Sequence, residues 1–220
     1  MLRYPAVFKH TPILSMVFWS VFTKLADTTV LMPLAVALAA WLAYEGRWRA
    51  AISWLFLFCA GLGIVLISKV AYVGWGIGIA SLDFRGFSGH AMRIAAVMPV
   101  LCYLFLQSRA KNVVLVALLF AVGFSIAIGI SRLVLHQHSI SEVISGLLLG
   151  GAIGFGFLAL DQVRAVMPLN PIVVASFVIV MVPGLMAKPA PTERWIEDIA
   201  LYLSGRDQPY RHTVDPHKLP

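Results

Sequence analysis

Six long stretches of this chain carry no charged side chain, and they constrain its fold more than any other feature. The stretches are residues Thr28–Tyr44, Ala50–Ser68, Ile94–Ser108, Asn112–Ser131, Val143–Leu160 and Ala165–Ala187. A membrane-spanning helix needs about 20 apolar residues at a rise of about 1.5 Å each. The two shortest stretches reach that length with polar flanking residues at the interface. The sequence therefore predicts an all-α, polytopic membrane helix bundle with about six transmembrane helices.

The composition points the same way. Hydrophobic residues make up 60% of the chain and charged residues 12%, whereas a soluble domain is about half apolar and about a quarter charged. The formal net charge of +7 could suggest nucleic acid, but basic residues beside spans usually set topology or contact anionic lipid. We therefore expect the lipid bilayer as partner and no nucleic acid. Cys59 and Cys102 fall inside spans, where their spacing suggests neither a disulfide nor a metal pair.

Both ends of the chain are expected at the membrane interface. The apolar run Ile13–Phe22 is short for a span and is not followed by a signal-peptide cleavage site. Residues 1–25 are therefore interpreted as an interfacial segment, with a seventh span as the alternative. Residues 26–187 would form the transmembrane domain. Residues 188–220 would form a tail whose segment Thr192–Gly205 has the pattern of an amphipathic interfacial helix.

Charges in the short connections predict the orientation. Arg47 and Arg49 lie in one connection, Arg109 and Lys111 in another, and both connections fall on the same side of the predicted bundle. The positive-inside rule places this side in the cytoplasm, together with the connection Asp161–Arg164. The opposite ends of the spans would then face the extracytoplasmic side. The scarcity of long loops favours a bacterial inner membrane.

Ionisable residues gather at span ends on that extracytoplasmic side, and charges in or beside spans usually mark function. His138 and Glu142 are four residues apart at a helix start, so they share a face and can pair. A carboxylate that holds one imidazole nitrogen fixes the tautomer and leaves the other nitrogen free to attack. His136 lies next to this pair but belongs to no such pattern.

Other polar residues at these span ends suit a phosphate. Ser88 and Gly89 precede a helix, where free backbone N–H groups and the dipole favour an anion. Arg132 offers a planar fork for phosphate oxygens, Lys69 offers a point charge, and His90 can give and take a proton. Cations, helix N–H groups, a nucleophile and an acid together indicate phosphoryl transfer, in which most of the catalysis is positioning and charge neutralisation.

At these positions the chain resembles the type 2 phosphatidic acid phosphatase superfamily of integral membrane lipid phosphatases. That family's signature has three parts: Lys-x6-Arg-Pro, Pro-Ser-Gly-His and Ser-Arg-x5-His-x3-Asp. The second part appears here as Phe-Ser-Gly-His at Phe87–His90. The third appears as Ser131–Arg132, followed at the family's spacing by His138 and Glu142. Order and spacing match over roughly Lys24–Leu160.

The resemblance implies a role for each position. His138 would attack phosphorus and form a phosphohistidine, with Glu142 orienting its ring. His90 would protonate the leaving alkoxide or phosphate and then activate water. The phosphoryl oxygens would be bound by the remaining matched residues, which are Lys69, Ser88, Gly89 and Arg132. The family needs no metal, so no metal and no cofactor are expected.

The chain departs from the family pattern at three positions. Glu142 stands where Asp is usual, which keeps the carboxylate, and Phe87 replaces Pro. More seriously, Gly76 and Ile77 stand where the first part of the signature has Arg-Pro, so one phosphate-binding cation is missing. Arg85, three residues before the serine of the second part, is our candidate for supplying that cation. Arg93 is the less favoured candidate, and a packing role suits it better.

The family and the position of the site suggest a substrate class. A polar site at the ends of membrane spans suits a lipid phosphate or pyrophosphate whose tail stays in the bilayer, and we favour a polyprenyl (undecaprenyl) pyrophosphate. Three alternatives stay open. The same site could transfer the phosphoryl group to a lipid, or the chain could bind or transport lipid phosphate without catalysis. The third alternative is a transition-metal site. Its ligands would be His90, His136, His138 and Glu142, but it leaves the nearby cations Lys69 and Arg132 unexplained.

Overall fold

The structure is a computed structural model, and it describes residues 13–160, 163 and 171–210. Its helices in chain order are α1 (Ile13–Thr23), α2 (Thr28–Tyr44), α3 (Trp48–Trp75), α4 (Gly89–Leu106), α5 (Lys111–Val134), α6 (Ile140–Leu158), α7 (Pro171–Met186) and α8 (Thr192–Ser204), with single 3-10 turns at Lys24–Ala26 and Ala80–Leu82. No strand forms among the described residues, where one isolated β-bridge joins Ile79 and Phe84. The all-α prediction is confirmed.

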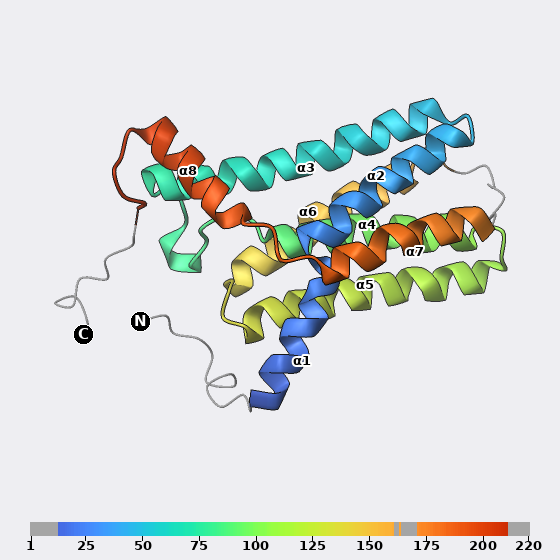
Figure 1. Ribbon diagram of the computed structural model, residues 1–220, viewed down its shortest axis with the longest axis horizontal. Coiled ribbons are helices and arrows are strands. Elements are labelled where there is room, and N and C mark those ends of the chain that lie inside the picture. The colour runs from blue at the N-terminus through green and yellow to red at the C-terminus, as the bar shows by residue number, and fades with distance from the viewer. Residues whose placement is uncertain (1–12, 161–162, 164–170, 211–220) are drawn as a thin grey trace.

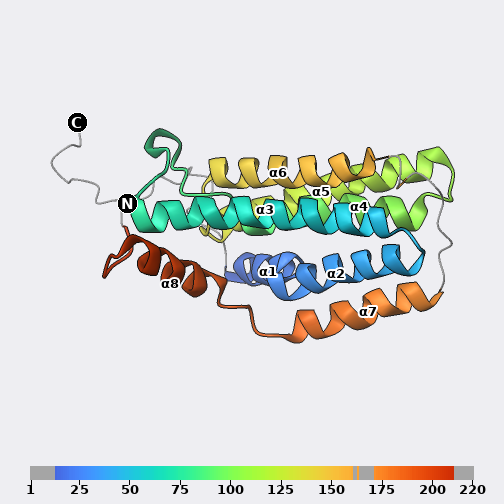
Figure 2. The same cartoon turned by 90° about the horizontal axis from the view of Figure 1, so that it is seen from above.

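Helices α2 to α7 lie side by side along the long axis of the molecule (Figure 1). Helix α1 leaves this bundle at an angle, and α8 lies at one end, where it packs against α3 (Figures 1 and 2). Figure 2 shows α2 and α7 on one side of the bundle and α4, α5 and α6 on the other. The described part of the chain is therefore one bundle with an additional helix at one of its two ends.

Within the described part of the chain, five helical segments are long and apolar enough to cross a membrane. The first, Met16–Tyr44, includes most of α1 together with α2, and the others are α3, α4, α5 and α6. Helix α7 is apolar but shorter, and the start of the predicted sixth stretch, Ala165–Ala187, lies outside the described residues. Parts of the predicted terminal segments 1–25 and 188–220, and most of the connection at 161–164, also lie outside them.

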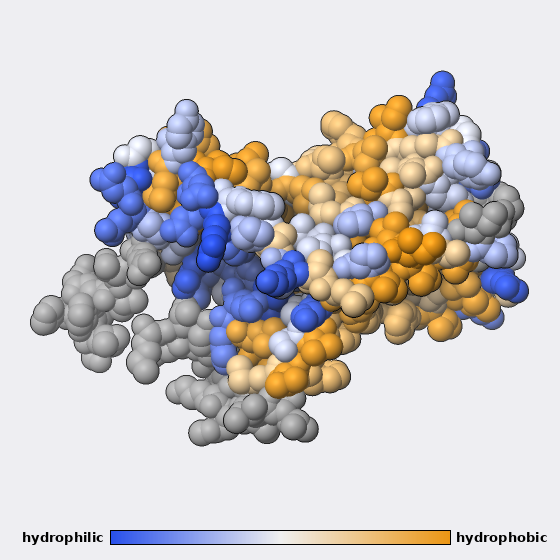
Figure 3. Space-filling model, in the orientation of Figure 1, coloured by the Kyte–Doolittle hydropathy of each residue, from blue (hydrophilic) through white to orange (hydrophobic). Residues whose placement is uncertain are grey.

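The sides of the bundle expose large apolar side chains. Phe56 on α3 and Phe120 on α5 are 71% and 59% exposed. Hydrophilic residues gather instead at the end of the bundle near α8 and at the opposite tips (Figure 3). An apolar belt between two polar ends is the surface that a bilayer requires, so the chain is an integral membrane protein.

Helix α4 is the centre of the bundle and packs chiefly against α5 and α6. Its contact with α6 depends on Gly146, Gly150 and Gly154, which follow one another at four-residue steps on α6. A Cβ atom at Gly146 would lie 2.6 Å from the carbonyl oxygen of Ser88, and one at Gly154 would lie 2.7 Å from that of Ala96. Small residues let the two backbones touch. The start of α4 and the start of α6 are thereby held against each other.

Candidate active site

Four helix ends meet at the α8 end of the bundle. They are the end of α3, the start of α4, the end of α5 and the start of α6. A cavity of about 840 Å³ lies between them. Its lining includes six of the eight residues predicted for the site, which are Lys69, Arg85, His90, Arg132, His138 and Glu142. Ser88 and Gly89 lie at the start of α4, directly beside His90.

The start of α6 fixes His138. Ser139 caps the helix in a capping box, in which its side chain accepts a hydrogen bond from the backbone N–H of Glu142. The Glu142 carboxylate in return accepts hydrogen bonds from the Ser139 N–H at 3.2 Å and from His138 Nδ1 at 2.7 Å. Its second oxygen accepts from the backbone N–H of Arg85 at 3.0 Å. Glu142 is 6% exposed. Because its carboxylate is buried and accepts three hydrogen bonds, it is held in one orientation.

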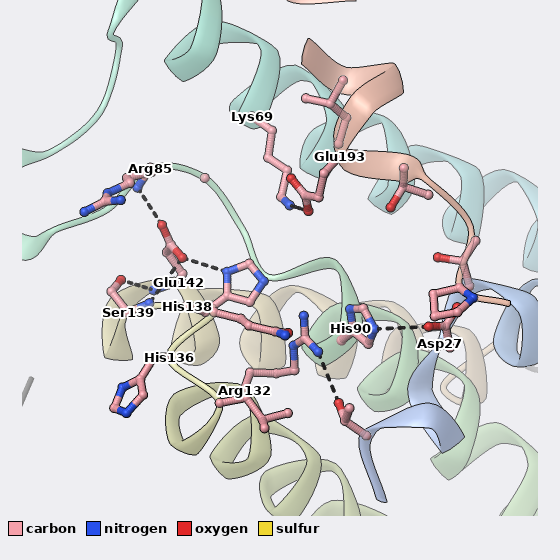
Figure 4. A pocket seen from close by; sticks show the side chains of 18 of the residues that line it. Asp27, Lys69, Arg85, His90, Arg132, His136, His138, Ser139, Glu142 and Glu193 are labelled. Carbon is pink, nitrogen blue, oxygen red and sulfur yellow. Dashed lines mark hydrogen bonds and ion pairs between the residues drawn. The ribbon is translucent and has the colours of Figure 1, made fainter. Parts of the chain in front are cut away.

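This hydrogen bond decides which nitrogen of His138 is available. A carboxylate only accepts hydrogen bonds, so Nδ1 carries the proton and Nε2 keeps its lone pair. Figure 4 shows the ring of His138 standing between Glu142 and the interior of the cavity. Burial lowers the pKa of His138 below its usual value, although the hydrogen bond to Glu142 acts in the opposite direction. The ring is therefore neutral and nucleophilic at neutral pH.

The start of α4 presents unpaired donors. Ser88 precedes the helix, and its side chain makes no capping hydrogen bond. Its buried hydroxyl has no partner among the described residues. The first N–H groups of a helix also lack intrahelical partners, and the helix dipole adds a partial positive charge there. Gly89, the first residue of the helix, is buried, and a Cβ there would lie 3.3 Å from Arg93. Neither Ser88 nor Gly89 is among the residues that line the cavity, so anion binding by the start of α4 stays a prediction.

Two predicted cations differ in how they are held. The guanidinium of Arg132 donates to Thr23 Oγ1 at 3.3 Å, and its buried Nε has no partner in the described part of the chain. The ammonium of Lys69 lies 2.5 Å from Glu193 on α8. Burial raises the pKa of Glu193, but the Lys69 ammonium more than offsets this, so the pKa lies below its usual value. Glu193 therefore stays ionised on Lys69 at neutral pH.

Arg85 lines the cavity, and its guanidinium is paired with a neighbouring carboxylate. Its guanidinium donates two hydrogen bonds to Asp83, at 2.9 and 3.1 Å, and Figure 4 shows it pointing away from His138 and His90. Its backbone N–H supports Glu142 instead. A role for Arg85 in phosphate binding stays a prediction.

Helix α4 also carries His90 and Arg93, and His90 faces a residue that we did not predict. His90 Nε2 lies 4.0 Å from Asp27 Oδ2, and both residues line the cavity. Arg93 Nη2 lies 3.5 Å from His90 Nδ1. Arg93 is 8% exposed and does not line the cavity. It therefore packs behind His90.

Sequence reasoning missed Asp27 and Glu193. Asp27 precedes two threonines and an apolar run, which is the pattern of a helix N-cap, and Glu193 lies in the first turn of the amphipathic helix. Neither pattern indicates a site. His136 also lines the cavity, with a backbone φ of 55°. Within the described ranges no three His, Cys, Asp or Glu side chains are grouped as the ligands of a metal ion would be.

Comparison with known proteins identifies a family. A family model described as the PAP2 superfamily matches residues 78–165, which include the start of α4, all of α5 and the His138–Glu142 pair. The chain is 39% identical over 208 residues to a Klebsiella pneumoniae protein described as an uncharacterized 22.5 kDa protein in the cps region, and the match covers 91% of this chain and 98% of that protein. No solved structure matches the chain. From its sequence and its site, the chain belongs to the PAP2 superfamily of membrane phosphatases.

Proposed function

We propose that the protein is a membrane lipid phosphate or pyrophosphate phosphatase that acts through a phosphohistidine on His138. One observation carries the proposal: a buried glutamate holds Nδ1 of His138 at 2.7 Å and leaves Nε2 free in a cavity lined by cations. Simple binding of an anion needs no oriented nucleophile. Membership of the PAP2 superfamily supports a phosphatase-type activity.

The proposed reaction has two halves. In the first, Nε2 of His138 attacks phosphorus, and the bond from phosphorus to the leaving oxygen breaks as His90 protonates that oxygen. Charge builds up on the phosphoryl oxygens, where Arg132, Lys69 and the start of α4 stabilise it. In the second half, water attacks phosphorus and gives a proton back to His90 as the bond to Nε2 breaks, which releases phosphate and restores both histidines. No metal is required by this scheme.

The position of the cavity suggests the substrate and the side of the membrane. It lies at one end of the apolar bundle, so a lipid tail can remain in the bilayer while its phosphate enters. The basic connections α2–α3 and α4–α5 lie at the opposite end, which the positive-inside rule assigns to the cytoplasm. We propose an extracytoplasmic site in a bacterial inner membrane, with a polyprenyl pyrophosphate such as undecaprenyl pyrophosphate as the favoured substrate.

The purified protein in detergent, with and without EDTA, should release phosphate from at least one member of a panel of lipid phosphates. The panel includes polyprenyl pyrophosphate, phosphatidic acid and phosphatidylglycerophosphate. We expect His138→Ala to lower kcat by about 1,000-fold or more, since no other group can form the covalent intermediate. His136→Asn is the control, because Asn tolerates the positive φ at that position, and it should keep most of the activity.

Three outcomes would contradict the proposal in different ways. Binding of lipid phosphates without turnover would indicate a silent binder or transporter. Transfer of the phosphoryl group to a lipid acceptor without phosphate release would indicate a phosphotransferase. Loss of activity in EDTA, restored by a divalent cation, would contradict the metal-independent mechanism.

A further inference from the structure

One wall of the cavity, formed by the turn between α1 and α2, holds no residue of the family signature and lies outside the family match at residues 78–165. It contributes Thr23, Lys24 and Asp27 to the lining. The turn is held on both sides of Lys24. The Thr23 hydroxyl accepts a hydrogen bond from Arg132 at 3.3 Å, and Asp27 caps α2 by accepting from the Thr29 N–H at 3.1 Å. The fold therefore fixes where the backbone of Lys24 lies.

Lys24 is a cation of the cavity lining that no carboxylate neutralises. Two other cations of the same lining are paired, Lys69 with Glu193 and Arg85 with Asp83. Among the described residues, no ion pair includes Lys24, whose side chain is exposed. An ammonium without an acidic partner can bind an anion that enters the cavity without first losing a competing contact.

The position of Lys24 relative to the two histidines decides which anion it meets. Figure 4 shows Glu142 and His138 on one side of the cavity and His90, with Asp27 beyond it, on the other. In phosphoryl transfer the attacking and leaving atoms lie roughly in line through phosphorus, so a group displaced by His138 leaves towards His90. The Asp27 N–H donates to the carbonyl oxygen of Lys24 at 3.0 Å, which places Lys24 in the wall that the leaving group approaches.

An apolar surface leads from Lys24 towards the bilayer. Val17 and Val21 precede Lys24 at steps of four and three residues, and they are 57% and 60% exposed. Both lie on α1, which leaves the bundle at an angle (Figure 1) and belongs from Met16 onwards to a segment apolar enough to span a membrane. A lipid tail can therefore lie along α1 while the phosphate nearest to that tail reaches Lys24.

We infer that Lys24 is a specificity-determining residue, which binds the lipid-linked phosphate of a pyrophosphate substrate. The inference rests on the proposed function. The terminal phosphate lies between Arg132 and His138, and the second phosphate, between it and the tail, accepts a charge-assisted hydrogen bond from the Lys24 ammonium. Lys24 thereby favours pyrophosphates over monophosphates, because a monophosphate ester has a carbon atom in place of the second phosphorus.

The same placement assigns the bond that breaks. Nε2 of His138 forms a bond to the terminal phosphorus, and the bond from that phosphorus to the bridging oxygen breaks with its electron pair going to oxygen. The bridging oxygen takes the proton of His90, and a lipid monophosphate leaves. Lys24 holds this product phosphate on the leaving side while water attacks the phosphohistidine and returns the proton to His90.

The test compares polyprenyl pyrophosphate with the polyprenyl monophosphate of the same tail, by initial rates of phosphate release from the purified full-length protein. Lys24→Met keeps the aliphatic stem and removes the charge. We expect it to lower kcat/KM for the pyrophosphate about tenfold or more and to leave that for the monophosphate within about twofold. Lys24→Arg keeps the charge and should keep most of the activity on the pyrophosphate. Lys188→Met is the control, because Lys188 is an exposed lysine between α7 and α8 that does not line the cavity, and it should change neither constant.

Three results would overturn the inference. One is an unchanged kcat/KM of Lys24→Met for the pyrophosphate, and another is a loss in Lys24→Arg as large as in Lys24→Met. The third is an equal loss for both substrates, since this would place Lys24 at the reacting phosphate or, where thermal unfolding also changes, in the fold. A wild type that hydrolyses only monophosphates would likewise refute the role of Lys24 and leave the proposed function standing. A wild type that releases phosphate from no lipid phosphate would refute the proposed function itself.

Discussion

Two side-chain pairs that each include a glutamate lie in the same cavity, and the protein holds them very differently. The His138–Glu142 pair is buried, with side chains 9% and 8% exposed, and lies on the α4–α6 side of the cavity. The Lys69–Glu193 pair joins α3 to α8, and its glutamate side chain is 75% exposed. Exposed ion pairs contribute about 0–1 kcal/mol, whereas a buried carboxylate with three hydrogen bonds is expensive to disturb. The proposed nucleophile His138 thus lies on the rigidly held side of the cavity, and the exposed ion pair lies on the α8 side.

The largest expected effect comes from the packing of α4 against α6, which supports the side of the cavity that carries His138 and Glu142. Gly150→Ala should destabilise the protein by about 3 kcal/mol and abolish most of the activity, since its Cβ would overlap the backbone carbonyl of Met92. The neighbouring Gly151→Ala is the control, because a Cβ there meets nothing within 4 Å. Thermal unfolding and phosphate release measure both variants. Equal stability of the two would show that the α4–α6 contact is not a constraint on the site.

Glu142→Gln tests the buried pair itself. The amide can donate to Nδ1 and so favours the tautomer with its proton on Nε2, which blocks the nucleophile. We expect kcat to fall by about 100-fold, and thermal stability to fall as well, because the partly buried Ser139 N–H loses its acceptor. Glu142 also raises the pKa of His138 against the effect of burial, so the acid limb of kcat/KM, already below pH 6.5, should move to lower pH in the variant. A limb that moves to higher pH would contradict this account of the pair.

Glu193→Gln tests the exposed pair and has the smallest expected effect. A carboxylate on Lys69 competes with the phosphoryl oxygens of the substrate, and its removal should lower KM about threefold with kcat unchanged. Inorganic phosphate should inhibit the variant more strongly for the same reason. Glu197→Gln, one turn further along α8, is the control and should leave both constants unchanged. A raised KM for Glu193→Gln would show instead that Glu193 holds Lys69 in position for the substrate.

Most of the site could be predicted because its chemistry is local in sequence. The spacing from His138 to Glu142 fixes one helical turn, so their hydrogen bond follows from the residues alone. The alternation of spans brings Lys69, His90 and Arg132 to one end of the bundle without knowledge of the packing. Arg85 is the exception. Asp83, two residues earlier, binds its guanidinium, and a loop conformation of this kind cannot be read from residue types.

The sequence by itself determined the membrane bundle, the end of it that carries the polar residues, and the pairing of His138 with Glu142. These depend on apolar length and helical period, which are properties of single segments. Only the tertiary structure placed Asp27 opposite His90 and Glu193 on Lys69, because each of these pairs joins helices far apart in the chain. The side-chain packing that decides such contacts follows from the crossing of helices, and no single segment encodes it.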